Sequence, residues 1–533
     1  MRHQTMQPLR NVLFIMCDQL RWDYLSCYGH PTLATPNIDA LARRGVRFER
    51  AFVQSASCGP SRMSYYTGRY VSSHRAFGNF VALPLDEVTL GDYLRQRGLR
   101  VAVAGKTHAE GAPEALRARG IDPDSQAGVL AMQAGFEPFD RHDGVLVDGA
   151  REELAQNRYT RYLHEQGYPG ANPWLSHANS GLGSDGRVLS GWEMRHARTP
   201  ARVEKRHSET AYTTRRAMDF IDEQGERPWC LHLSYIKPHW PYVAPSPYHA
   251  LYGDGDVLPA SRHAAELDDP HPILRSYLKH PAAQSFAQDS VRRTVVPVYM
   301  GLVKQIDDEL GALFEQLDRQ GRFDDTLVVF TSDHGDYLGD HHLGEKELPH
   351  DAVTRVPLIV CDPRPAADAT RGSADAEHLV EAIDLLPTFI DALGGTPDGD
   401  RIEGRSLQPL LHGAAPAEWR EFVVSEFDYS FRSATRIELG RPVKHCSMVT
   451  LRDHDWKFVH CEGLRPMLFD LRRDPQEFFD LGADPTHEAV RNRYAAKLVE
   501  WMLARKRYTS VSDAFVGDWL ADERFRGMAI GVW

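Results

Sequence analysis

Short, unbroken apolar runs separated by helix-like segments constrain the fold of this 533-residue chain more than any other feature. A strand that is covered on both faces of a parallel sheet has no exposed side, so it reads as a continuous apolar run. Between the runs, residues 35–45 begin with Thr-Pro and end in Gly, and residues 298–320 carry one apolar stripe, so both segments are predicted helices. The chain is therefore predicted to be α/β, with a large, mostly parallel central sheet and helices on both faces. The predicted strands are Asn11–Cys17, Arg100–Gly105, Trp229–Tyr235, Thr326–Ser332 and Val356–Cys361.

The pattern changes after residue 395. Residues 447–460 and 467–471 indicate an antiparallel hairpin series, and residues 485–506 indicate a long helix. We expect three parts: a catalytic domain over 1–395, a smaller C-terminal α+β unit over 396–510, and a tail over 511–533. The tail ends in the apolar stretch GMAIGVW, which is expected to pack on its own chain or on a second subunit of a dimer or tetramer.

Composition excludes several classes of protein. The net charge of −12 argues against a nucleic-acid or membrane-surface binder, so an anionic small molecule would have to be attracted by local cations or a metal. The first apolar run is too short for a signal peptide, and no run approaches the ~20 apolar residues that cross a bilayer. The seven cysteines are odd in number and lack C-x-x-C spacing, which favours a reducing compartment. The predicted location is the cytoplasm.

Polar residues with metal-ligand or acid–base chemistry follow several of the predicted strands. In an open α/β sheet the carboxyl ends of the strands meet where ligands bind. One such residue alone is more often a helix cap or a satisfied core group, but their recurrence indicates a site. Two carboxylates with one imidazole suit a divalent cation: the oxygens favour Ca²⁺, Mg²⁺ or Mn²⁺, and the histidine favours Mn²⁺ or Zn²⁺. The residues are Asp18, Lys106, His108, His239, Asp333 and His334, with Gln19 as a further oxygen donor.

The segment SCGPSRMSYYTGRY, residues 57–70, contains the cysteine with the most unusual surroundings. From the residues alone, Cys58 could be a buried thiol at a turn, a nucleophile, a metal ligand or the precursor of a modified residue. CGPSR followed by TGR resembles the signature of the formylglycine-dependent sulfatases of the alkaline phosphatase superfamily. Other segments follow in that family's order: AGKTH, KPHWP, TSDHGDYLGDHHLGEK, AIDLLPT and LFDLRRDPQEFFDLGADP. The resemblance extends from about residue 11 to about residue 505.

The resemblance implies a modified nucleophile and one metal ion, Ca²⁺ or Mn²⁺. A formylglycine-generating enzyme would oxidise Cys58 to 3-oxoalanine (formylglycine), whose hydrate attacks the ester and also binds the metal. Arg62 would steady the hydrate through charge-assisted hydrogen bonds. The implied metal ligands are Asp18, Gln19, Cys58, Asp333 and His334.

The resemblance also implies the remaining roles in the site. Lys106 and Lys346 would bind oxygens of the transferred group, and Asn79 would contact the substrate. His239, alone or with Lys346, would protonate the leaving oxygen, and His108 would act as the base that releases the product. The intact set argues against a non-catalytic binding protein built on a decayed enzyme scaffold.

Within that superfamily the chain is also similar to the phosphonate monoester hydrolase and phosphodiesterase branch. The similarity lies in Asp18-Gln19, SCGPSR, HRAFGN and HWPYVAPSPYHALY. Members of that branch tend to carry Tyr and Thr where this chain has Lys106 and His108, the sulfatase arrangement. A sulfate monoester keeps its charge on terminal oxygens that lysines hold, so we expect an arylsulfatase-like sulfuric ester hydrolase. Phosphonate monoester or phosphodiester hydrolysis is the alternative, or a promiscuous side activity.

Overall fold

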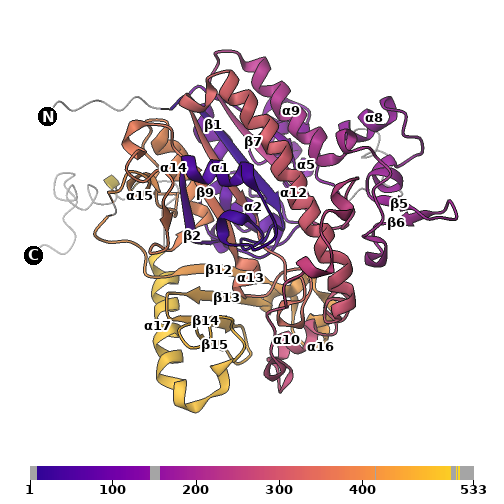
Figure 1. Cartoon of the computed structure of the whole chain (residues 1–533). Helices are drawn as coiled ribbons and strands as arrows, with labels where there is room; N and C mark the ends of the chain where they lie inside the picture. Colours follow the sequence, from indigo (N-terminus) through magenta and orange to yellow (C-terminus); the bar gives the residue numbers. More distant parts are fainter. Residues whose placement is uncertain (1–8, 145–156, 415, 506–511, 513, 516–533) are drawn as a thin grey trace, which may run out of the picture.

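The computed structural model describes residues 9–144, 157–414, 416–505, 512, 514 and 515. Its centre is a mixed, mostly parallel sheet of nine strands within these residues, in the order β10-β2-β9-β8-β1-β7-β3-β4 with β11 beside β2 (Figure 1). Only β9 runs antiparallel to its neighbours, β8 and β2. The predicted fold class is confirmed. The strands are β1 (Asn11–Asp18), β2 (Val46–Phe52), β3 (Arg100–Gly105), β4 (Glu137–Arg141), β7 (Trp229–Pro238), β8 (Thr326–Ser332), β9 (Arg355–Cys361), β10 (Ala374–Asp375) and β11 (Val380–Glu381).

Helices cover both faces of this sheet, and β1 shows why residues 12–17 form an unbroken apolar run. Leu13, Ile15 and Cys17 pack into one core cluster, and Val12, Phe14 and Met16 pack into the other. Every side chain of the strand is therefore buried. The first cluster contains residues of α1 (Pro36–Arg44), α9 (Glu209–Gln224) and α12 (Asp289–Arg319). The second contains residues of α2 (Cys58–Thr67), α4 (Leu90–Arg95) and α14 (Leu385–Ala392).

Strand β2 and helix α12 are two of the elements that differ from the sequence prediction. Strand β2 was not predicted, because Arg47, Glu49 and Arg50 interrupt its apolar pattern and only part of the strand is buried. Helix α12 begins at Asp289, well before the predicted stripe, and continues through Pro297. The first turns of α12 were not predicted because they are polar and because a proline is unfavourable inside a helix.

The C-terminal unit is an antiparallel sheet in the order β12-β13-β14-β15, flanked by α17, which is yellow at the bottom of Figure 1. One face of the sheet packs on α17 through Leu451, Phe458 and Tyr494. The elements are β12 (Val423–Asp428), α16 (Ser433–Glu438), β13 (Ser447–Arg452), β14 (Trp456–Cys461), β15 (Met467–Asp470) and α17 (Glu488–Ala504).

The other face of the small sheet shares a core with the catalytic part. Met448, Val459 and Phe469 lie in one apolar cluster with Tyr277 and Tyr337. The chain between the units, by contrast, packs on the large sheet, since Leu407, Leu410 and Leu411 belong to the cluster of α14. The boundary at residues 395 and 396 therefore stays a prediction.

Two further predictions concern the chain ends and membranes. The apolar ending over residues 527–533 lies outside the described residues. In the described part of the chain, no helix combines the length and hydropathy needed to cross a bilayer.

Candidate active site

The candidate nucleophile begins a helix that is buried along its whole length. Cys58 is the first residue of α2, and Gly68, at φ 66°, ends that helix in the left-handed conformation. The Ser57 side chain does not cap the helix. Instead, Asn79 Oδ1 accepts hydrogen bonds from the Gly59 N–H (2.8 Å) and the Ser57 hydroxyl (3.0 Å). Asn79 thus fixes the first turn, where the helix dipole favours a negative charge at position 58.

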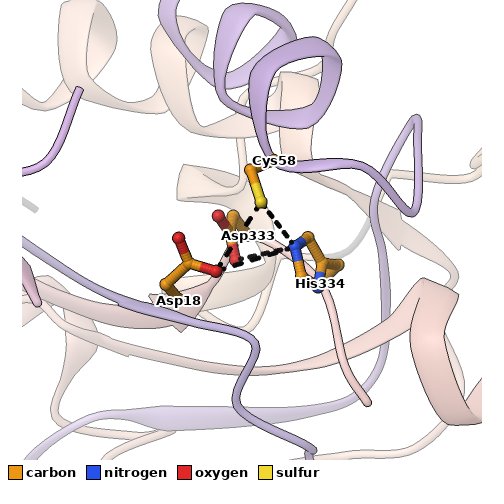
Figure 2. Close-up of side chains that lie close together, drawn as sticks. All are labelled: Asp18, Cys58, Asp333 and His334. Atoms are coloured by element: carbon orange, nitrogen blue, oxygen red, sulfur yellow. Dashed lines mark hydrogen bonds and ion pairs between the residues drawn. The ribbon is translucent and has the colours of Figure 1, made fainter. Parts of the chain in front are cut away.

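Four buried side chains from three segments meet beside the helix start (Figure 2). Asp18, Cys58, Asp333 and His334 each offer a ligand atom, and these atoms lie within 4.8 Å of one another. His334 Nε2 is 3.1 Å from Cys58 Sγ and 3.7 Å from an oxygen of each aspartate. Because His334 Nδ1 donates to the Gly335 carbonyl at 2.8 Å, the lone pair of Nε2 faces the cluster. In formylglycine, oxygens would take the place of Sγ, and the oxygen-rich set then fits a divalent cation.

The Arg62 guanidinium pairs with the carboxylates of Asp18 and Asp333. Its Nε donates to Asp333 Oδ2 at 2.8 Å, and its Nη2 lies 3.5 Å from Asp18 Oδ2. Its Nη1 donates to the Lys106 carbonyl (3.0 Å) and the Ser234 hydroxyl (2.8 Å). The guanidinium is fully buried and orients both aspartates.

Two lysine ammonium groups complete the charge around Cys58. Lys346 Nζ is 3.2 Å from Cys58 Sγ, and Lys106 Nζ is 2.5 Å from Asp18 Oδ2. Burial opposes ionisation of the thiol, but Lys346 and Lys106 outweigh it and hold the pKa of Cys58 well below its usual value. The same arrangement suits any anion placed at this position.

Gln19 lies beside the cluster, with its amide already engaged. Its Oε1 accepts from Lys346 Nζ at 2.9 Å, and its Nε2 donates to Asp336 Oδ2 at 2.5 Å. Its backbone N–H also donates to Asp333 Oδ1 at 3.0 Å. As a metal ligand, Gln19 would use the second lone pair of Oε1 or exchange Lys346 for the ion.

Two histidines face the same space from other strand ends. His239 donates its backbone N–H to the Asp18 carbonyl (3.1 Å), and its Nδ1 donates to the Trp240 carbonyl (2.7 Å). The side chain also forms a hydrogen bond with Cys58, for which Nε2 remains. Burial and the nearby Lys346 lower the pKa of His239 to about 4. His108 has a left-handed backbone, with φ 53°, that Asp143 Oδ1 supports by accepting the Thr107 and His108 N–H groups. Among the described residues, its Nδ1 has no hydrogen-bond partner.

Several of these groups line one cleft of about 1050 Å³. Three residues that support the site were not assigned from the sequence: Asp336, Asp143 and Ser234. Asp336 stands in the quoted DHGD segment, which is a usable signal, whereas the other two carry none. The cleft lining includes Cys58, Asn79, Phe80, Lys106, His108, His239, Trp240, Lys346 and Arg432.

A mostly parallel sheet with carboxylates, imidazoles, lysines and a helix-terminal cysteine at its strand ends defines an ester hydrolase of the alkaline phosphatase-like fold. The chain belongs to the sulfatase family: the family model "Sulfatase" matches residues 10–395. A second model, "N-sulphoglucosamine sulphohydrolase, C-terminal", matches residues 339–504.

Relatives and solved structures come from two groups of hydrolases. The multifunctional alkaline phosphatase superfamily protein PehA of Trinickia caryophylli is 34% identical, over 93% of this chain and 95% of its own. The choline-sulfatase of Rhizobium meliloti is 27% identical, over 89% and 83%. The crystal structure of the phosphonate monoester hydrolase of Agrobacterium radiobacter is similar with a TM-score of 0.80 and 30% identity, covering 95% of this chain and 97% of that chain.

Proposed function

We propose that this protein is a sulfuric ester hydrolase that cleaves sulfate monoesters with a formylglycine formed from Cys58. The observation that carries the proposal is the convergence of the Lys106 and Lys346 ammonium groups around Cys58 and Asp18. A sulfate monoester carries its negative charge on oxygens at one end, so paired ammonium groups at the nucleophile stabilise it there.

The proposed cofactors fit the residues present. Asp18, Asp333, His334 and residue 58 would hold one Ca²⁺ or Mn²⁺, with Gln19 as an additional ligand. The ion would supply Lewis-acid polarisation of the ester and acidify the nucleophile. The hydrated aldehyde would supply two hydroxyls on one carbon, one to attack and one to release the product.

The chain's own residues would orient the ester and move the protons. Lys106 and Lys346 hold the charged oxygens, and Asn79 lines the cleft beside them. His239 donates a proton from Nε2 to the leaving oxygen. Since an anionic ester beside the imidazole stabilises its protonated form, binding raises the pKa of His239 from about 4. His108 accepts the proton of the hydroxyl that releases the product, so that sulfate leaves.

Hydrolysis of phosphonate monoesters or phosphodiesters is the second candidate. It is favoured by sequence identities of 30% and 28% to two solved phosphonate monoester hydrolases, each with a TM-score of 0.80. The same nucleophile, cation site and acid would serve a phosphorus ester, and promiscuity between the two classes would follow from that shared apparatus.

Mass spectrometry and matched kinetics test the proposal. The peptide containing Cys58 should be about 18 Da lighter than its thiol form, because sulfur and two hydrogens are replaced by one oxygen. kcat/KM should be highest for an aryl sulfate in a series with the same aryl group on sulfate, methylphosphonate and phosphodiester. An active protein with only the thiol form excludes the formylglycine mechanism, and a preference of several orders of magnitude for a phosphorus ester selects the second candidate.

Three wider proposals accompany this function. Cytoplasmic location, maturation by a formylglycine-generating enzyme and assembly into a dimer or tetramer stay predictions from the sequence. Gel filtration with light scattering measures the last of them.

A further inference from the structure

The turn that carries Lys346 has an unfavourable backbone on both sides of the lysine. Glu345 and Glu347 adopt φ values of 64° and 95°, in the left-handed region that non-glycine residues seldom occupy. Such strain persists only where surrounding contacts hold it, and it concentrates at functional sites. Here the turn delivers the buried Lys346 Nζ to 3.2 Å from Cys58 Sγ.

One side chain holds both strained residues. Arg432 Nε donates to Glu347 Oε2, and Arg432 Nη2 lies 3.7 Å from Glu345 Oε2. The Tyr277 hydroxyl donates to the same Glu347 oxygen at 3.1 Å. A guanidinium has several donors in a fixed plane, so it can restrain two carboxylates at once, which a lysine cannot do as well.

Arg432 itself is fixed in the C-terminal unit. Its backbone N–H donates to the Tyr429 carbonyl at 3.0 Å, and the Tyr429 N–H donates to the Cys446 carbonyl at 3.1 Å. Tyr429 and Cys446 are buried in the apolar cluster that joins the C-terminal sheet to the catalytic part. Arg432 therefore extends toward the Lys346 turn from a backbone that is hydrogen-bonded to buried residues of the C-terminal unit.

We propose that Arg432 is a positioning residue: it holds Glu345 and Glu347 so that the Lys346 ammonium stays against the nucleophile. The C-terminal unit thereby contributes to the active site without supplying a group that touches the reacting atoms. This inference rests on the proposed function, in which Lys346 binds oxygens of the transferred group.

A double-mutant cycle separates positioning from direct contact, because Arg432 also lines the cleft. Arg432→Ala, Lys346→Ala and the double variant are compared with the wild type by kcat/KM and by the Kd for inorganic phosphate, which needs no turnover. Lys346→Ala should lower kcat/KM by about 10²–10³-fold, as for loss of one charge-stabilising donor. Arg432→Ala should lower it by about 10-fold, yet the double variant should match Lys346→Ala within about 2-fold. The change in phosphate Kd that Arg432→Ala causes in the wild type should likewise be absent in the Lys346→Ala background.

Matched variants control for a general loss of stability. Arg465 is also in the C-terminal unit, is 30% exposed like Arg432, and pairs with Asp480. Arg465→Ala should leave kcat/KM unchanged, whereas Arg432→Lys should recover part of the loss. If Arg432→Ala does not fold, Glu347→Gln weakens the same contact from the other side by removing its charge. Its effect on kcat/KM should also disappear in the Lys346→Ala background.

The outcomes distinguish this inference from the proposed function. Additive losses, or an unchanged Arg432→Ala, would overturn the positioning role while the wild type remains a working hydrolase. A wild type that neither hydrolyses the esters nor binds phosphate would overturn the proposed function and the positioning role with it. Mass spectrometry of the Cys58 peptide in each variant ensures that unequal modification does not imitate either result.

Discussion

Asn79 has a structural task and a proposed binding task on one amide group. Its oxygen caps α2 by accepting from Ser57 and Gly59, and the side chain also lines the cleft. The sequence predicted only the substrate contact, because the cap joins two segments about twenty residues apart and no local pattern records it.

Two substitutions at this position separate the tasks. Asn79→Ala should lower the free energy of unfolding by about 1 kcal/mol, the usual cost of a lost cap. Asn79→Asp keeps an acceptor for both donors, so its stability should stay near wild type. Its carboxylate would repel an anionic ester, however, and lower kcat/KM by about 10-fold or more. Urea unfolding and steady-state kinetics measure both effects; equal destabilisation by Asp and Ala would contradict the capping role.

Asp333 is the residue at which metal binding is best tested. Adding Ca²⁺ or Mn²⁺ to chelator-treated protein should raise its stability, by about 2.7 kcal/mol when the ion is at 100 times its Kd. Asp333→Asn keeps the side-chain shape but has a single oxygen, so it can accept from Gln19 or from Arg62 and not from both, and it also removes a ligand charge. The gain should therefore largely disappear. Thermal unfolding with and without the ion measures this. Asp324→Asn, at an exposed residue, serves as control, and an equal gain in Asp333→Asn would exclude the proposed ion site.

At the scale of single elements, the buried strands were predictable and the loops that use them were not. β1, β3, β7, β8 and β9 were recognised because burial on both faces of the sheet makes most of each strand apolar, although β7 and β8 keep a few buried polar residues. Their carboxyl ends then placed the candidate site residues near one another. The supporting contacts, such as Asp143 under His108 and Arg432 against Glu347, depend on loop paths that hydrophobic periodicity does not encode.

The start of α9 illustrates such a contact and gives a pH prediction. Glu209 is buried and accepts hydrogen bonds from His142 (2.8 Å) and Trp174, with Lys237 Nζ 3.8 Å away. Burial opposes its ionisation, but His142 and Lys237 outweigh it and lower the pKa of Glu209 from 4.5 to about 2. A carboxyl whose pKa is lower in the folded state adds stability above the unfolded pKa and loses it as the pH falls through the folded pKa.

Glu209→Gln should therefore be less stable than wild type by about 3 kcal/mol at pH 7. The difference should shrink as the pH falls from 4.5 through about 2, where the wild-type carboxyl takes up its proton. Urea midpoints across this range measure it. Glu315→Gln, at an exposed residue on α12, should show no such trend, and a difference for Glu209→Gln that does not vary with pH would contradict the ionised state.

At the scale of the whole molecule, the two units share more buried contacts than the change in their sequence patterns suggests. The sequence separated an α/β part from an α+β part, and both are present. It gave no sign that β13, β14 and β15 share an apolar cluster with the catalytic part, because the pairing of two buried faces leaves no mark in either sequence pattern.

This shared core predicts that the chain unfolds in one step. Met448→Ala, at a residue 1% exposed in the shared cluster, should lower stability by about 2–5 kcal/mol and shift the single calorimetric transition of the entire chain. Loss of activity on heating should coincide with that transition. Met502→Ala, at a residue 55% exposed on α17, should leave it unchanged. A separate early transition for the C-terminal unit would show that the two parts unfold independently.

Under the proposed formylglycine mechanism, the complete burial of α2 also dictates an order of events during biosynthesis. Cys58 is only 2% exposed, and Ser61 and Arg62 are inaccessible. No other protein can therefore bind this segment once the domain has folded. Oxidation of the thiol would have to occur while the nascent polypeptide is still open. A sample that matured without its aldehyde would stay inactive however long it was later incubated with the modifying enzyme, and only unfolding and refolding in that enzyme's presence would activate it.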